Sequence, residues 1–327
     1  MLRKLTMSAA GCAAVAAAIF FLMPSESATS LGGNSRSWVS GVGDDANPCS
    51  RTAPCKTFPG AISKTTENGS INCVDNGAFG TVTITKSITI DCHELYAGVL
   101  AAGTNGIVIN FDAFNAADTA RTVRLRNLNI NGLTTGLNGI RIIGAGTGSE
   151  VMIEDTTIEN FSSGGPSQGI IDQRSGGGEL NVSNTTIRNI GGASASGIRI
   201  SSGGANRIHA TLDAVHVENG DAFGLLTKTG ANAMVTNSVF SGNGSGGIEA
   251  ENDAVIQVEH SVSSDNAFGL RATSPGTIRI ADNDITFNNQ GLAGTIESFG
   301  TNRIAGNATA GSAPTPIGAV SEAHGQQ

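Results

Sequence analysis

The sequence predicts an all-β fold, a parallel β-helix solenoid of roughly nine or ten coils. The first observation behind this prediction is a glycine that is followed each time by Ile or Leu, at intervals of 22 to 30 residues. It stands at Gly139, Gly169, Gly197, Gly224, Gly247, Gly269 and Gly291. A marker that returns at such a period is typical of repeats that each form one coil.

The second observation is an asparagine that keeps step with the glycine. It recurs at Asn160, Asn189, Asn219, Asn243, Asn266 and Asn289, at intervals of 23 to 30 residues. We expect these asparagines to form a structural ladder at a turn, in which each amide bonds to the amides of the coils above and below.

The third observation is strand-like alternation without helical spacing. The stretch TIRIA at 277–281 alternates apolar and polar residues, as do GIRI at 139–142 and at 197–200. Gly, Ser, Asn and Thr fill the gaps between such stretches, so each coil should hold two or three short strands joined by tight turns. A leucine-rich repeat has a similar period, but no coil matches its L-x-x-L-x-L-x-x-N pattern.

The two ends of the chain differ from the repeats. A basic start and an apolar run predict a signal peptide at 1–27, with an uncleaved anchor as the alternative. Residues 28–70 are predicted to form an N-terminal cap in which a helix within 54–68 covers the first coil with Phe58, Ala61 and Ile62. Residues 71–307 should form the β-helix, and 308–327, which are small and polar, a disordered tail.

The four cysteines that follow the predicted signal peptide all lie in the first third of the chain, at Cys49, Cys55, Cys73 and Cys92. An even number in an exported chain indicates two disulfides, and of the three possible pairings we favour Cys49–Cys55 with Cys73–Cys92. A zinc site is the alternative, which the C-x5-C spacing makes the weaker hypothesis.

The stretches SWVSGVGDDANPCSRTAPCKTFPGAISKT (37–65) and ITKSITIDC (84–92) resemble the N-terminal cap of a group of exported bacterial right-handed β-helix proteins of the pectin-lyase-like superfamily. The resemblance covers about 37–307 and implies a right-handed coil and a secreted or periplasmic protein. It implies no particular activity, although better understood members of the superfamily are polysaccharide lyases, glycoside hydrolases and epimerases. The polygalacturonase motifs N-T-D, D-D, G-H-G and R-I-K are not all present, since the nearest matches are Asp44-Asp45 in the cap and Arg207-Ile208-His209.

The resemblance places functional sites of the superfamily on the outer face of one sheet, and the alternation predicts which charged residues face outward there. The strands after the recurring glycine present a candidate groove of Arg199, Glu249, Glu251 and Arg271. Two carboxylates on one strand face could act as acid and base on a glycosidic bond. The alternative is a solvated cross-strand ion pair without chemistry.

These observations lead to two hypotheses for function. The first is an exported, non-catalytic scaffold or surface-interaction module that contacts extracellular or cell-surface polysaccharide. The second is a carbohydrate-active enzyme, a polysaccharide lyase or glycoside hydrolase. A net charge of −8 disfavours a nucleic-acid partner, which requires a basic patch, and a membrane is expected only if the N-terminal segment is uncleaved. We expect no metal and no cofactor.

Overall fold

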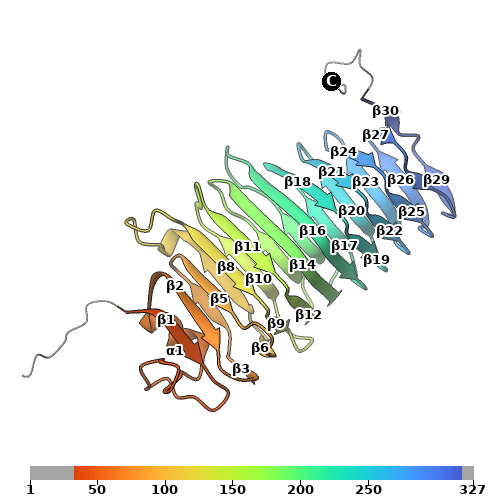
Figure 1. Cartoon of the computed structure of the whole chain (residues 1–327). Helices are drawn as coiled ribbons and strands as arrows, with labels where there is room; N and C mark the ends of the chain where they lie inside the picture. Colours follow the sequence, from red (N-terminus) through yellow and green to blue (C-terminus); the bar gives the residue numbers. More distant parts are fainter. Residues whose placement is uncertain (1–32, 319–327) are drawn as a thin grey trace, which may run out of the picture. The chain divides into compact units, whose positions relative to one another are not determined.

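A computed structural model of the chain describes residues 33–318, and the predicted signal peptide lies outside the described residues. Every strand pair in this region is parallel, and successive coils stack along one direction (Figure 1). Each coil contributes strands to a large sheet, which contains two rows, and to a small sheet of ten strands. The described residues therefore form a parallel β-helix, and the ten strands of the small sheet agree with the nine or ten coils predicted.

Row 1 of the large sheet contains β1 (Asn34–Val39), β2 (Thr65–Cys73), β5 (Ile88–Asp91), β8 (Thr122–Arg126), β11 (Glu150–Glu154), β18 (Ala231–Thr236), β21 (Val255–Glu259), β24 (Thr277–Ala281), β27 (Ile296–Gly300) and β30 (Thr315–Pro316). Row 2 contains β3 (Gly77–Ala78), β6 (Ala97–Leu100), β9 (Asn129–Asn131), β12 (Thr157–Phe161), β19 (Val239–Ser241), β22 (Val262–Ser264), β25 (Asp284–Thr286) and β28 (Arg303–Ile304). The long strands β14 (Gly178–Ile190) and β16 (Ile208–Glu218) run through both rows and join them into one sheet.

The small sheet contains β4 (Val82–Ile84), β7 (Ile107–Asn110), β10 (Asn138–Ile143), β13 (Gln168–Asp172), β15 (Ser196–Ile200), β17 (Phe223–Thr227), β20 (Gly246–Glu251), β23 (Phe268–Thr273), β26 (Gln290–Gly294) and β29 (Thr309–Gly311). The residue after each recurring glycine points inward, so that Ile140, Ile170, Ile198, Leu225 and Ile248 stack in register along the core. This stacking of apolar side chains is what holds one coil on the next.

The two rows of the large sheet meet at a turn that one left-handed residue makes in eight successive coils. This column contains Asn127, Asp155, Asn184, Ala214, Asn237, His260, Asp282 and Thr301, with φ between 44° and 65°. Asn and Asp tolerate this conformation better than other residues that carry a side chain, because their short polar groups bond locally. The need for a left-handed residue at this turn therefore explains why Asn or Asp recurs once per coil in much of the chain.

A second left-handed column follows row 2, and it corrects the predicted asparagine ladder. Asn160, Asn189 and Asn219 are the left-handed residues of this column, where Gly242, Asp265 and Phe287 stand in later coils. The ladder occupies the next position and consists of the buried residues Asn243, Asn266 and Asn288 and of the partly buried Asn307. Asn289 is exposed and lies one residue beyond the ladder, so its assignment to the ladder was wrong.

The amides of this ladder bond directly to one another. The Nδ2 of Asn243 donates to Oδ1 of Asn266 at 3.1 Å, and the Nδ2 of Asn266 donates to Oδ1 of Asn288 at 3.1 Å. The backbone N–H of each residue donates to the same oxygen of the next coil, at 2.9 and 3.0 Å. Asn189 does donate to Asn160, at 3.0 Å, but that contact is at the exposed left-handed position.

The N-terminal cap contains the helix α1 (Phe58–Lys64), which buries Phe58, Ala61 and Ile62 against the first coil. Thr57 caps the helix by accepting a hydrogen bond from the N–H of Gly60. One disulfide joins Cys49 to Cys55 within the cap, and the other joins Cys73 at the end of β2 to Cys92 just after β5. This is the pairing that we favoured, and the second disulfide links two successive coils.

The C-terminal boundary lies beyond the predicted one. Strands β29 and β30 fall within 308–327, where we expected a disordered tail, and they pair with β26 and β27. Backbone pairing across coils does not need large apolar side chains, so a segment of small residues can still extend the sheets. A 3-10 helix, η1 (Phe111–Ala113), is the remaining helical element among the described residues.

Candidate functional site

The predicted groove residues lie on the outer face of the small sheet in the predicted register. Glu249 on β20 pairs directly with Arg271 on β23, and Leu226 on β17 stands opposite Glu249 on the other side. Arg199 on β15 is in the same column but is separated from Glu249 by Leu226. The structure therefore brings together Glu249 and Arg271, and leaves Arg199 two coils away from Glu249.

Glu249 is not a solvated surface carboxylate, because its side chain is only 1% exposed. Both of its oxygens accept hydrogen bonds from the Arg271 guanidinium at 2.8 Å, and Thr273 donates a further bond at 3.0 Å. The guanidinium in turn lies 4.9 Å from the ring centres of Phe223 and of Phe268. A bidentate pair that two aromatic rings shield is a rigid unit with a fixed charge arrangement.

The second carboxylate of the predicted groove is also paired. Glu251 accepts from the Lys228 ammonium of the preceding coil at 2.6 Å, and both side chains are mostly buried. Each glutamate therefore has its own cation on a neighbouring strand. A general acid or base must reach the substrate through a free oxygen, and this pairing holds both carboxylates in structural contacts.

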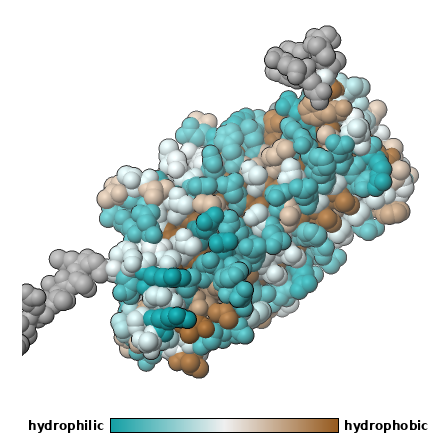
Figure 2. Space-filling model, viewed as in Figure 1, coloured by the Kyte–Doolittle hydropathy of each residue, from teal (hydrophilic) through white to brown (hydrophobic). Residues whose placement is uncertain are grey.

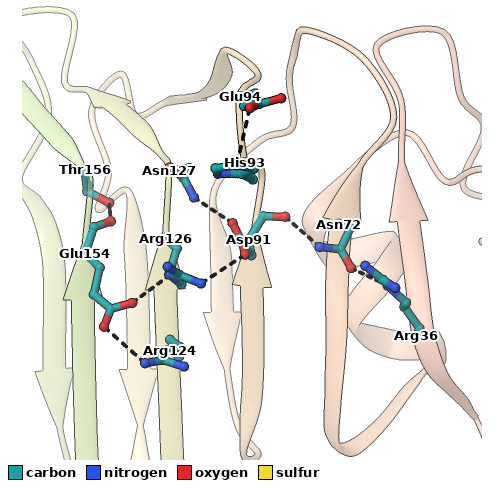
Figure 3. A network of polar contacts seen from close by, with 10 residues as sticks. All are labelled: Arg36, Asn72, Asp91, His93, Glu94, Arg124, Arg126, Asn127, Glu154 and Thr156. Atoms are coloured by element: carbon teal, nitrogen blue, oxygen red, sulfur yellow. Dashed lines mark hydrogen bonds and ion pairs between the residues drawn. The ribbon is translucent and has the colours of Figure 1, made fainter.

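A second set of charged residues, which the repeat pattern did not predict as a site, crosses the outer face of row 1 near the cap (Figure 3). Arg126 on β8 bridges Asp91 on β5, at 3.4 Å, and Glu154 on β11, at 2.7 Å. Arg124 contacts Glu154 at 3.2 Å, and Asn127 donates to Asp91 at 2.7 Å. The signal in the sequence was the alternation TVRLR at 122–126, whose two arginines face the same side.

A buried ion pair lies at the corner where the small sheet ends. Asp172 stands in the inward column between Ile142 and Ile200, the apolar residues of the two adjacent coils. Arg174 folds back onto it with two guanidinium nitrogens, and both residues are fully buried. The same guanidinium donates to Ser149, at 2.7 Å to the hydroxyl and 3.1 Å to the carbonyl. These contacts compensate the two buried charges, and the pair has no access to a ligand.

One buried aspartate has a pKa that its hydrogen bonds control. Burial by itself would raise the pKa of Asp118, but the hydroxyl and N–H of Ser87 and the N–H of Arg121 donate to its carboxylate and hold that pKa below the usual value. Asp118 is 2% exposed, so it acts as a structural anchor between the loop before β8 and the start of β5.

No group of three or more His, Cys, Asp or Glu side chains within residues 33–318 is arranged to hold a metal ion. No helix in the same region is long and apolar enough to span a membrane. The visible face of the molecule is mostly polar, with hydrophobic residues exposed in small groups (Figure 2). Two disulfides are typical of proteins that fold outside the reducing cytoplasm.

The stacked coils and the cap define a protein of the parallel β-helix class. In agreement with this, residues 168–320 match the family described as right handed beta helix region. A search of the curated proteins found no match.

Solved structures with this fold include that of pectate lyase Pel9A. Its TM-score is 0.58 at 13% identity, and the alignment covers 86% of this chain and 81% of that one. The A-module of the mannuronan C-5 epimerase AlgE4 from Azotobacter vinelandii is similar with a TM-score of 0.45 at 12% identity, over 76% of this chain and 90% of the module. XylC in complex with xylose gives 0.46 at 11% identity, over 80% and 69%. At 13% identity the likeness to the pectate lyase shows a shared fold.

Proposed function

We propose that this protein is an exported, non-catalytic β-helix scaffold whose outer faces contact extracellular or cell-surface glycans. The observation that carries the proposal is the pairing of both groove carboxylates: Glu249 is buried and held by Arg271, and Glu251 is held by Lys228. A pair of carboxylates that cleaves a glycosidic bond has to present one acid and one base to the substrate. Here each carboxylate has a cation as its partner, which favours a structural role.

The glycan part of the proposal draws on the fold and on the surface. The pectate lyase whose structure is similar acts, by its name, on a polysaccharide, and a long outer face of parallel strands offers a repeated surface to a repeated ligand. Export is supported by the two disulfides. The predicted signal peptide supports it as well.

The second candidate function is a carbohydrate-active enzyme, which the likeness to the pectate lyase favours. The two functions differ in turnover. We would incubate the purified protein with pectin, alginate, xylan and bacterial exopolysaccharides, and follow both reducing ends and unsaturated products. In parallel, a glycan array would report binding.

We expect binding without turnover. Turnover that disappears in Glu251→Gln or Arg271→Ala, while the far-UV circular dichroism stays unchanged, would replace the scaffold by the enzyme. The matched control is Glu297→Gln, because Glu297 also forms an ion pair on an outer face, with Arg279 at 2.8 Å, but on the large sheet. Absence of both turnover and binding would refute the glycan partner.

A further inference from the structure

The single tyrosine of the chain, Tyr96, forms an exposed aromatic platform beside the start of β6. Its side chain is fixed although 56% of the residue is exposed. The hydroxyl donates to Oδ1 of Asn129 in the next coil at 3.0 Å, and the backbone N–H donates to Oδ1 of Asn76 at 2.8 Å. The ring lies against Gly98, where a Cβ would come within 3.4 Å of it. A ring anchored in this way loses little conformational freedom when a ligand stacks on it.

Beside the ring the surface has a hollow of about 360 Å³. Residues of three successive coils line it: Glu94, Leu95, Tyr96 and Ala97 from one, Asn127, Leu128 and Asn129 from the next, and Asp155 from the third. Glu94, Asn127 and Asp155 have positive φ, and the last two belong to the left-handed column between rows 1 and 2. A volume of this size is within the range of sites that bind small ligands, about 300 to 1,000 Å³.

The polar groups of the hollow combine fixed and unused hydrogen-bonding atoms. Asn127 is fixed by its bond to Asp91, and Asp155 accepts from Asn184 at 2.6 Å through one of its oxygens. Among the described residues, Nδ2 of Asn129 has no hydrogen-bond partner, although Oδ1 of the same amide is held by Tyr96. A donor, several carboxylate oxygens and an aromatic face therefore converge on one hollow. A sugar ring matches this arrangement, because it has an apolar face and a rim of hydroxyl groups.

Charge decides which kind of sugar fits. The carboxylates of Glu94 and Asp155 line the hollow, and the imidazole of His93 lies 3.6 Å from the carboxylate of Glu94. The nearby Arg126 is neutralised by Asp91 and Glu154, so it offers no unpaired cation to an anionic ligand (Figure 3). The whole chain has a net charge of −8. Like charges in such a site repel a polyuronate.

We propose that the Tyr96 hollow binds a sugar unit of an uncharged polysaccharide, with the ring of Tyr96 under the sugar and Asn129, Glu94 and Asp155 at its hydroxyl rim. This inference rests on the proposed function and gives it a position and a ligand class. One aromatic platform gives weak, rapidly exchanging binding, which suits a long polymer held by several molecules.

The experiment uses the fact that the chain has one tyrosine. The full-length mature protein would be produced with 3-fluorotyrosine, so that a single fluorine resonance reports on position 96. Cellohexaose, xylohexaose and mannohexaose are the uncharged probes, and hexagalacturonate is the anionic probe. We expect at least one uncharged probe to shift the resonance in a saturable way, and hexagalacturonate to leave it unchanged at the same concentration and ionic strength.

Calorimetry on variants separates the ring from the rest of the surface. Tyr96→Ala should weaken binding of the uncharged probe about fivefold or more, and Tyr96→Phe, which keeps the ring, should weaken it less. The matched control is Phe287→Ala, since Phe287 is another aromatic residue that is 68% exposed, in a coil far from the cap. That variant should bind as the parent does.

The outcomes distinguish the two proposals. Glycan binding that is equal in the parent and in Tyr96→Ala would overturn the Tyr96 site while the glycan-contacting scaffold stands. A larger shift with hexagalacturonate than with the uncharged probes would overturn the ligand class. If no glycan binds in either assay, the proposed function and this inference both fail.

Discussion

The strongest test of the fold concerns the buried asparagine ladder, through the variant Asn266→Ala. Asn266 is 3% exposed and makes five side-chain hydrogen bonds. Its Nδ2 donates to the carbonyl of Phe240, the hydroxyl of Ser263 and Oδ1 of Asn288, at 3.0, 3.2 and 3.1 Å. Its Oδ1 accepts from the backbone N–H and from Nδ2 of Asn243, at 2.9 and 3.1 Å.

The stability lost in Asn266→Ala depends on which hydrogen-bond partners of Asn266 keep another hydrogen bond. Nδ2 of Asn243 keeps its bonds to Val217 and Ser241, and Oδ1 of Asn288 keeps the backbone N–H at position 266. The N–H of Asn243 loses its acceptor, and a buried unpaired donor costs about 1–3 kcal/mol. Each of the other lost bonds contributes about 0.5–1.5 kcal/mol, and water can replace some of them. We therefore expect the free energy of unfolding to fall by about 3 kcal/mol.

The assay is equilibrium unfolding in urea, followed by far-UV circular dichroism, together with hydrogen exchange of the Asn243 amide, which should lose protection. Asn289→Ala is the control, because Asn289 also recurs with the repeat but is exposed. That change should alter stability by less than about 0.5 kcal/mol. Equal losses in the two variants, or no loss in Asn266→Ala, would refute the assignment of the ladder.

Three further predictions concern buried charges and the cap. The folded state lowers the pKa of Asp118, so the stabilisation from this carboxylate is complete above the unfolded pKa of about 3.9 and is lost as the pH falls through the folded pKa. In Asp118→Asn, the free energy of unfolding should therefore depend less on pH on the acid side of the profile. Arg174→Met should cost about 3–5 kcal/mol in urea unfolding by leaving the Asp172 carboxylate unpaired, whereas the double variant Asp172→Ile/Arg174→Met should recover most of that loss; equal losses would contradict the pairing. Cys73→Ser should lower stability by about 2–4 kcal/mol, and thiol labelling of both Cys73 and Cys92 in the folded parent would exclude the disulfide.

Periodicity was enough to predict the coils and their register. The branched apolar residue after each glycine must point into the core, so the spacing of Ile198, Leu225 and Ile248 also aligns the neighbouring outward residues. For this reason the sequence alone predicts that Arg199, Glu249 and Arg271 lie in one outward column. In stacked coils, residues that are one repeat apart in the sequence lie next to each other on adjacent strands, so the repeat predicts the register.

The spacing could not predict which of two adjacent positions in the coil each asparagine occupies, because Asn is favoured at both for different physical reasons. At Asn219 it tolerates a left-handed backbone, and at Asn243 it satisfies buried turn groups. Because asparagines occupy both positions, their spacing stays regular although some lie at the left-handed turn and others in the buried ladder.

The burial and the contacts of the charged residues could not be predicted from the sequence either. The burial of Glu249 depends on Arg271 and on two aromatic rings, Phe223 and Phe268, that come from the coils on either side. Arg174 is buried because Gly146 and Gly178 leave room for its side chain, since a Cβ at either position would approach it within 2.6 Å. Except for the contact of Arg174 with Gly178, these contacts join residues about 20 to 30 positions apart, and the repeat spacing does not show which side chains meet.

The two ends of the described solenoid differ in how they would respond to a pulling force. At one end the Cys73–Cys92 disulfide ties two coils together, and at the other β29 and β30 are short strands whose residues are all exposed. Each coil is held only by its neighbours, so tension should detach coils singly, beginning at the C-terminal end. A coil of 22 residues, such as the one between Ile248 and Leu270, would release roughly 75 Å of chain. The molecule would thus lengthen in steps while the cap stays folded, as an extensible tether with one fixed end.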